Sequence, residues 1–350
     1  MRYRSSVSPV RWVGAVAALL AVAAPGLTAQ GLLVSGYADF EATWMNPFGS
    51  GNSDLYGDNH HFNLVMVGDI VDDVFVSGEV EYEHSGDEIS LEYGYVGYTG
   101  FKNVRIMAGK FIVPFGRFQK DLHPTWINKM IDRPHGFKNI LPQTYSDAGV
   151  WVSGAAPVEG GRRVTYDVFV VNGLMGPDGG DIRGFRDNID ETLPGGGRND
   201  NKAFGGRLGF EAAPEGFDIG GSFYYGGYSD DPALDLNLLM LGADAAYRRN
   251  GWELRAEVVH ANQDATGGDL KKTGGYAQIA WMATPKWEPV VRFSARSMPG
   301  TNQDQARVSF GLNFHVGPAA VFRINYHANI ERTAFSSNND TIKTQFAVVF

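Results

Sequence analysis

The sequence contains no cysteine, and it has no long apolar run after its N-terminal segment. Without cysteine the chain has no disulfide framework, no thiolate metal site and no cysteine nucleophile. Without a run of about 18 apolar residues it has no transmembrane helix. Positive charge is also scarce, because 30 lysines and arginines stand against 39 aspartates and glutamates. This balance argues against a nucleic-acid partner.

The N-terminal segment, residues 1–29, has the organisation of a secretory signal peptide. Three arginines near the start precede an apolar stretch at residues 13–24, and a small residue, Ala29, follows at the expected cleavage point. The stretch is too short for a spanning helix. A buried N-terminal helix is the alternative. We therefore expect export from the cytoplasm, with residues 30–350 as one mature domain.

Period-two alternation is what the mature sequence has in abundance. In residues 32–44, apolar or small residues occupy every second position, with mostly polar residues between them. The same alternation recurs at residues 74–83, 252–258 and 308–314. It is typical of a strand with one apolar and one polar face.

About sixteen such segments can be counted, and the connections between them alternate in length. They cover residues 32–45, 61–71, 74–84, 88–98, 104–112, 146–154, 162–172, 202–211, 217–226, 236–247, 252–260, 273–282, 287–294, 305–314, 320–328 and 341–350. Odd-numbered segments are followed by long polar links, with residues 85–87 as the one short case, and even-numbered segments by short turns. This asymmetry is typical of an outer-membrane barrel, which has periplasmic turns and extracellular loops.

Aromatic residues also gather beside the short turns, as in a membrane-interface girdle. They are Phe210, Phe217, Tyr247, Trp252, Trp281, Trp287 and Phe314. A soluble β-sandwich or β-helix would alternate too, but it has no reason to sort loops by length or to carry such a belt. We therefore predict an all-β fold, a transmembrane antiparallel β-barrel of about sixteen strands, because a closed barrel satisfies every backbone group in lipid.

Three stretches near the fifth and sixth segments carry a family resemblance. They read GKFIVPFGRF at 109–118, IDRP at 131–134 and YSDAGVWVSG at 145–154. The arrangement resembles the phosphate-selective porin family of O and P type porins. The resemblance implies a trimeric, sixteen-stranded channel whose third extracellular loop folds inward and narrows the lumen. By this likeness residues 113–145 are the constriction loop.

The residues of segment 113–145 support such a loop. Pro114 ends strand pairing and Gly116 permits a sharp turn. The segment is too apolar for disorder, so we expect it to pack against the barrel wall; a lid outside the barrel or a subunit contact is the alternative. Its charged residues, five basic and two acidic, are Arg117, Lys120, Asp121, Lys129, Asp132, Arg133 and Lys138.

Charge on the polar strand faces is unevenly distributed. Acidic residues gather early, at Asp39, Glu41, Glu79, Glu81, Glu83 and Glu92. Basic residues are mostly late, at Arg105, Arg207, Arg255, Arg292, Arg307 and Arg323. In a sixteen-stranded barrel an acidic wall would face a basic wall, and the field between them would select ions by sign. Alternatively, the arginines pair with Glu253, Glu257 and Glu288 and only satisfy the lumen.

The sequence offers little for other chemistry. His60 and His61 have no third metal ligand at a suitable spacing, and no motif frames a nucleophile, so we expect no metal, no cofactor and no enzyme activity.

Two functions stay open. The first is an outer-membrane porin that passes small hydrophilic solutes passively, with a preference for anions that could include phosphate. The second is a closed barrel with a structural or adhesin role in its loops. The expected partners are outer-membrane lipid and lipopolysaccharide, two further copies in a homotrimer, and the outer-membrane assembly machinery.

The sequence ends in alternation, with TIKTQFAVVF at residues 341–350. We interpret this segment as the closing strand, paired with residues 32–45. Phe346, Val348 and Phe350 also resemble the terminal signal that the assembly machinery reads.

Overall fold

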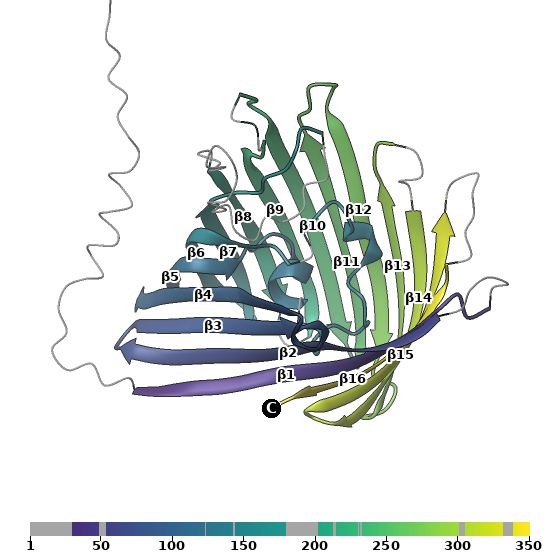
Figure 1. Ribbon diagram of the computed structural model, residues 1–350. Coiled ribbons are helices and arrows are strands. Elements are labelled where there is room, and N and C mark those ends of the chain that lie inside the picture. The colour runs from purple at the N-terminus through teal and green to yellow at the C-terminus, as the bar shows by residue number, and fades with distance from the viewer. Residues whose placement is uncertain are drawn as a thin grey trace, which may run out of the picture.

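A computed structural model describes residues 30–48, 54–122, 124–142, 144–179, 202–212, 215–229, 231, 233–300, 305–331 and 339–350. The predicted signal peptide lies outside these residues, as does most of the acidic loop that follows β7. Within them the chain forms sixteen strands that close into one antiparallel barrel, each paired with its neighbours in sequence (Figure 1).

The first eight strands are β1 (Gln30–Met45), β2 (Asp54–Val71), β3 (Val74–Glu83), β4 (Glu88–Phe101), β5 (Val104–Ile112), β6 (Ser146–Val158), β7 (Arg162–Val171) and β8 (Ala203–Ala212). The second eight are β9 (Gly216–Gly227), β10 (Asn237–Arg249), β11 (Trp252–Gln263), β12 (Leu270–Trp281), β13 (Trp287–Ser297), β14 (Gln305–Gly317), β15 (Ala320–Glu331) and β16 (Thr341–Val349). Three short helical turns complete the elements: η1 (His84–Gly86), η2 (Phe118–Leu122) and η3 (His135–Phe137).

The predicted strand count and order are confirmed, and the largest boundary error is at the start of β2. β2 begins at Asp54, not at residue 61, and its polar start stays paired with β1 beyond a bulge between Asp39 and Glu41. Alternation of apolar residues missed this part because backbone pairing does not need an apolar face. The loop after β1 is correspondingly shorter.

The two faces of the barrel differ as the alternation predicts. Outward side chains such as Phe40, Leu208 and Phe346 are about half exposed, whereas inward ones such as Asp39, Arg207 and Gln345 are buried. At the short-turn end, Trp252 and Trp281 stack with ring centroids 5.1 Å apart on the outer face. Their exposure suits an aromatic girdle. None of the helices in the described residues is long and apolar enough to cross a membrane.

The barrel closes where β1 pairs with β16, the pairing that the sequence predicted. The register sets Phe40 opposite Phe346 and Trp44 opposite Ile342. Phe350 extends this seam by two backbone hydrogen bonds with Gly36, at 2.8 and 2.9 Å. Its ring lies against Phe62, with centroids 5.8 Å apart. The last residue of the chain is therefore part of the closing seam.

Deleting Phe350 is expected to reduce the amount of folded barrel. The truncation removes two seam hydrogen bonds, worth about 1 kcal/mol each, together with the ring that covers Gly36. The measurement is the folded fraction recovered from membranes, scored by heat-modifiable migration on gels. Phe310→Ala is the control, because Phe310 is 51% exposed on the outer face of β14, away from the seam. Equal yields from both variants would contradict the assignment.

Candidate functional site

The segment between β5 and β6, residues 113–145, lies inside the barrel, and we call it the inner loop. It leaves the wall at Val113 and returns at Tyr145, whose carbonyl accepts a 2.8 Å hydrogen bond from the Val113 amide. Between these points it carries η2 and η3 and crosses the inward faces of many strands (Figure 1). It is therefore not a lid on the outside.

The first contacts of the inner loop are made by its backbone. The amide of Gly116 donates to Ser222 of β9 at 3.0 Å, and the amide of Phe118 donates to Glu257 of β11 at 2.8 Å. Gly116 has φ +70, and a Cβ there would lie 2.0 Å from a Glu257 carboxylate oxygen. Glycine is required at this turn by both its conformation and its surroundings.

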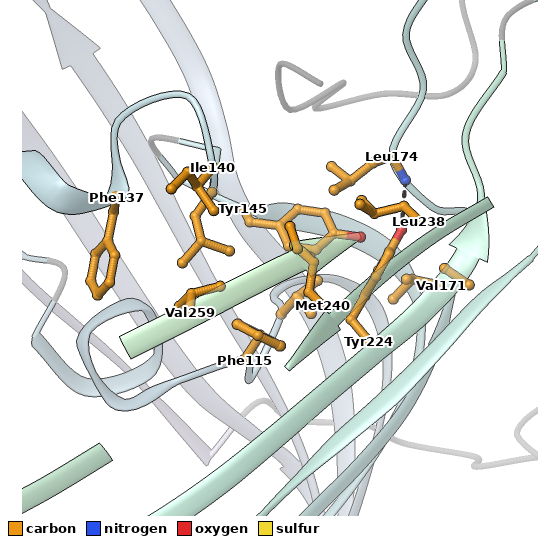
Figure 2. Close-up of a cluster of buried hydrophobic side chains, with 14 of the residues drawn as sticks. Phe115, Phe137, Ile140, Tyr145, Val171, Leu174, Tyr224, Leu238, Met240 and Val259 are labelled. Carbon is orange, nitrogen blue, oxygen red and sulfur yellow. Dashed lines mark hydrogen bonds between the residues drawn. The ribbon is translucent and has the colours of Figure 1, made fainter. Parts of the chain in front are cut away.

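Apolar side chains of the inner loop fill one side of the barrel interior. Figure 2 shows Phe115, Phe137, Ile140 and Tyr145 of the loop gathered over inward side chains of β7, β9, β10 and β11. All four loop residues are almost completely buried. Burying each such side chain contributes about 1.5–3 kcal/mol. This packing is the main reason why so long a connection holds one position.

Glycines of η3 and of β12 lie in direct backbone contact where η3 meets the barrel wall. A Cβ on Gly274 of β12 would lie 1.8 Å from the Gly136 carbonyl oxygen, and one on Gly136 would lie 2.1 Å from the Gly275 carbonyl oxygen. Only glycines allow the loop and the strand to approach so closely. These glycines therefore fix the position of the inner loop along β12.

Basic side chains of the late strands bind carbonyl groups of the inner loop. Arg292 of β13 donates to the Asp132 carbonyl at 2.7 Å, and Arg323 of β15 donates to the Thr125 carbonyl at 3.1 Å. Asn313 of β14 donates to the loop in the same way. These bonds supply donors to loop carbonyls that have left the sheet, which a buried backbone requires.

The Asp132 carboxylate is the ionic centre of the inner loop. Lys343 of β16 contacts it at 2.7 Å and Arg307 of β14 at 2.9 Å. Burial alone would raise the pKa of Asp132, but the charges of Lys343, His327 and Arg307 outweigh it and hold the pKa well below the usual range. Asp132 is therefore ionised at neutral pH.

The other charged residues of the inner loop mostly face wall carboxylates. Lys120 lies 2.5 Å from Asp167. Arg117 lies 3.2 Å from Asp218, and it also reaches Asp121. Lys129 bonds Glu288 of β13. The predicted net positive charge of the loop is thus largely matched by the wall behind it.

Two basic loop residues have no such carboxylate among the described residues. Arg133 is half-buried and donates to the Pro142 carbonyl at 2.8 Å, and burial lowers the pKa of Arg133 to about 10. Lys138 has an exposed side chain, while its carbonyl accepts a 2.8 Å hydrogen bond from Arg296.

The predicted acidic residues share the inward face of the first four strands. Glu79 accepts from Tyr37 at 2.8 Å and from Asn63 at 2.6 Å, and Asn63 also donates to Glu81 at 2.9 Å. Of the other predicted residues, Glu41 meets Lys343 at 3.6 Å, and Glu92 is buried nearby. The structure therefore brings the acidic group together along one wall.

The last two predicted acidic residues, Asp39 and Glu83, lie towards the rim of this wall and contact the same histidine. Asp39 accepts from Thr125 of the inner loop at 2.6 Å and contacts His61 at 3.0 Å, and Glu83 lies 3.5 Å from the same histidine. Thr125 thus ties the inner loop to β1. The loop crosses the interior from β9 to the seam.

The arginines of the predicted basic wall have different partners in the structure. Arg207 pairs with Asp244 at 2.7 Å and Arg255 with Glu253 at 2.7 Å, while Arg105 reaches only Ser153 at 3.3 Å. Of the carboxylate pairs expected for the arginines, only the one at Glu253 is formed. Arg292 and Arg323 bind carbonyl groups of the inner loop, and Arg307 binds the Asp132 carboxylate. Among the described strands these residues therefore do not form one continuous basic wall.

Sequence reasoning missed two features. Asn63, Asn313 and Asn325 hold the acidic wall or the inner loop, although their inward positions could be read from the alternation, and Asn128 within the loop donates to the Asp132 carbonyl. No sequence spacing gave His60 and His61 a third ligand, but η1 brings His84 beside His60, with ring centroids 5.0 Å apart. Only folding places η1 against β2, so no sequence spacing predicted this contact.

A family model described as Gram-negative porin matches residues 15–348. The chain belongs to the Gram-negative porin family. The outer membrane is therefore where this barrel resides. The narrower resemblance to phosphate-selective porins is not established by this match and stays a prediction.

Solved porin structures share the fold. The anion-selective porin from Comamonas acidovorans is 12% identical, with a TM-score of 0.67 over 91% of this chain and 99% of its own. OmpT of Vibrio cholerae in its trimer form is 10% identical, with a TM-score of 0.58 over 91% of this chain and 99% of its own. At such identities the likeness concerns the fold alone.

An uncharacterized protein of Aquifex aeolicus (strain VF5) is similar to this porin in sequence. It is 24% identical over 192 residues, which span 51% of this chain and 41% of that protein. The match therefore covers less than half of that relative's length, and it carries no functional assignment of its own.

The close contact between Gly274 and Gly136 can be tested by adding a methyl group. Gly274→Ala should displace η3 from β12 and destabilise the folded barrel by about 1–3 kcal/mol, the usual cost of overpacking. The measurements are the free energy of unfolding in urea and the rate of trypsin cleavage in the inner loop, which should rise. Gly221→Ala is the matched control, because its Cβ would meet only the Gly242 carbonyl oxygen, at 3.8 Å. If both variants behave alike, the contact does not position the loop.

The Asp132 ion centre predicts a pH dependence. The folded-state pKa of Asp132 lies below its ordinary value of 3.8, so its stabilising charge is present above that value and is lost as the pH falls towards the folded-state pKa. Wild-type channels should therefore become noisier below about pH 4, when the loop loosens. Asp132→Asn should already show raised noise at pH 7, because it removes the carboxylate that contacts both Lys343 and Arg307. Single-channel recordings of both proteins at pH 7 and pH 3 make the comparison.

Proposed function

We propose that this porin is a passive channel for small hydrophilic solutes and that the inner loop sets its width. The observation that carries the proposal is that Trp126 and Ile127 are 39% and 37% exposed although their loop lies within the barrel. Exposed side chains inside a barrel border a space that water reaches. The apolar side chains of the loop pack against β7, β9, β10 and β11, and the loop then crosses the interior to β1, where Thr125 bonds Asp39.

Buried charges of the barrel wall favour anions at the late strands, where Arg292 and Arg323 are each 3% exposed. Among the described residues, Arg292 and Arg323 bond only neutral oxygens, of amides and carbonyls, so their positive charges are not cancelled by a direct ion pair. On the opposite wall, Glu79 and Glu81 are held by neutral donors. A transverse field of this kind in a narrow passage sorts ions by sign.

We therefore propose that the channel prefers anions. The exposed side chain of Lys138 adds a further positive charge that attracts them. Phosphate belongs to this class of solute. The anion-selective porin of Comamonas acidovorans has the same fold, which supports the comparison.

The assembly of the porin is proposed from its relatives. OmpT of Vibrio cholerae is known in a trimer form, and the phosphate-selective porins that the chain resembles are trimeric, so we propose a homotrimer. Export through the signal peptide, contact with lipopolysaccharide, and recognition of Phe346, Val348 and Phe350 by the assembly machinery belong to the same proposal.

A closed structural barrel is the second candidate. It is favoured by the packing of the inner loop, whose apolar side chains are buried and whose charges mostly pair with the wall. Deleting residues 115–140 separates the two candidates in a planar bilayer. The channel should gain conductance, because the deletion removes the narrowing segment. A structural barrel should stay silent both before and after the deletion.

A salt gradient across a planar bilayer tests the sign of the selectivity. The reversal potential should have the sign of anion permeation. Lys138→Gln should lower the anion-to-cation permeability ratio by up to about fivefold, because a unit charge about 4 Å from an ion is worth about 1 kcal/mol in water. Lys286→Gln, in an exposed turn between β12 and β13, is the control and should leave the ratio unchanged. A reversal potential of cation sign would refute the anion preference but leave the channel intact.

A further inference from the structure

Three metal-ligating side chains converge at the long-loop end of the barrel, outside the site described above. Asp58 and His60 belong to the polar start of β2, and His84 belongs to η1, which joins β3 to β4. Their ligand atoms all lie within 4.8 Å of one another. Asp58 stands opposite Glu41 in the register of β1 and β2, so the group sits at the rim of the acidic wall.

The spacing of these atoms suits a shared cation. One oxygen of Asp58 lies 2.6 Å from Nδ1 of His84 and 3.2 Å from Nδ1 of His60. Ligands of a tetrahedral zinc ion, at metal distances of about 2.0–2.1 Å, are separated from each other by about 3.4 Å. An ion between the three atoms would therefore require side-chain rotations and no movement of the strands.

The backbone beneath His84 is held in an uncommon conformation. His84 and Ser85 have φ of +50 and +61, in the left-handed region that residues other than glycine rarely adopt. This turn sets the His84 ring 5.0 Å from the His60 ring, measured between centroids. Such strain persists where surrounding interactions over-determine it, often at ligand-binding positions.

A second group adjoins the first. His60, His61 and Glu83 also bring their ligand atoms within 4.8 Å of one another. Nδ1 of His61 lies 3.0 Å from Asp39, and Nε2 lies 3.5 Å from Glu83. A carboxylate on one imidazole nitrogen orients the other towards a metal, as outer-shell carboxylates do in zinc proteins.

We propose that Asp58, His60 and His84 form a binding site for a divalent transition-metal ion of the zinc class. Two imidazoles and one carboxylate are the donor set that zinc accepts, and a fourth position is supplied by water or by the adjoining His61 and Glu83. Magnesium and calcium prefer oxygen ligands throughout, so this site should bind them more weakly than zinc. The bound ion joins β2 to η1 and places positive charge beside the acidic wall.

Zinc titration of the mature, tag-free porin tests the proposal. The protein is folded in detergent, stripped with a chelator and titrated with zinc chloride by calorimetry, with magnesium chloride as the comparison. One zinc ion should bind per barrel. His60→Asn and His84→Asn should each weaken binding by at least about tenfold, since even outer-shell changes cost that much. His260→Asn is the matched control, because His260 is exposed on the outer face of β11.

A second measurement needs no variant. Zinc should protect His60 and His84 from diethyl pyrocarbonate, read by mass spectrometry, and should leave His260 reactive. The proposal is overturned if zinc does not bind, if magnesium binds equally well, if both histidine variants bind as the wild type does, or if His60 and His84 are not protected. None of these readouts depends on conductance, so they are independent of the channel proposal.

Discussion

The closed ring of backbone hydrogen bonds is the constraint on which the rest of this porin depends. In lipid no water is available for a free amide or carbonyl, so each strand must be paired on both sides and the last must return to the first. Here β16 pairs with β1, and Phe350 continues that pairing to the end of the chain. Closure in turn requires the period-two alternation, because every strand has lipid on one side and the lumen on the other.

The inner loop is a consequence of the same constraint. It leaves the sheet and enters the barrel, so its backbone groups need new partners. Inward arginines and asparagines of β13–β15 donate hydrogen bonds to its carbonyl groups. Asn325 accepts a hydrogen bond from the Ile131 amide, and glycines on β12 allow direct backbone contact. Arg292 and Arg323 therefore do two things at once. They hold the loop, and because they bind neutral oxygens, they keep their positive charge beside the lumen.

The fold was predictable from the sequence to a greater extent than the site. Alternation recovered all sixteen strands, since one face of each must be apolar, and it sorted Asp39 and Arg323 onto the inner face. It could not show that Asp132 would meet Lys343, which lies far away in sequence. Nor could it show that the inward arginines would bind carbonyls of the inner loop. Such contacts depend on which wall the loop reaches.

By itself the sequence determined the class of fold, the strand order, the face of the sheet on which a charged strand residue lies and the closing role of the last strand. These follow from local periodicity and from the cost of unpaired backbone in lipid. Only the tertiary structure decided which charges are cancelled, how closely η3 approaches β12, and that His84 stands beside Asp58 and His60. Those outcomes depend on positions across the lumen and on a left-handed turn, and residues brought together in this way leave no fixed spacing in the chain.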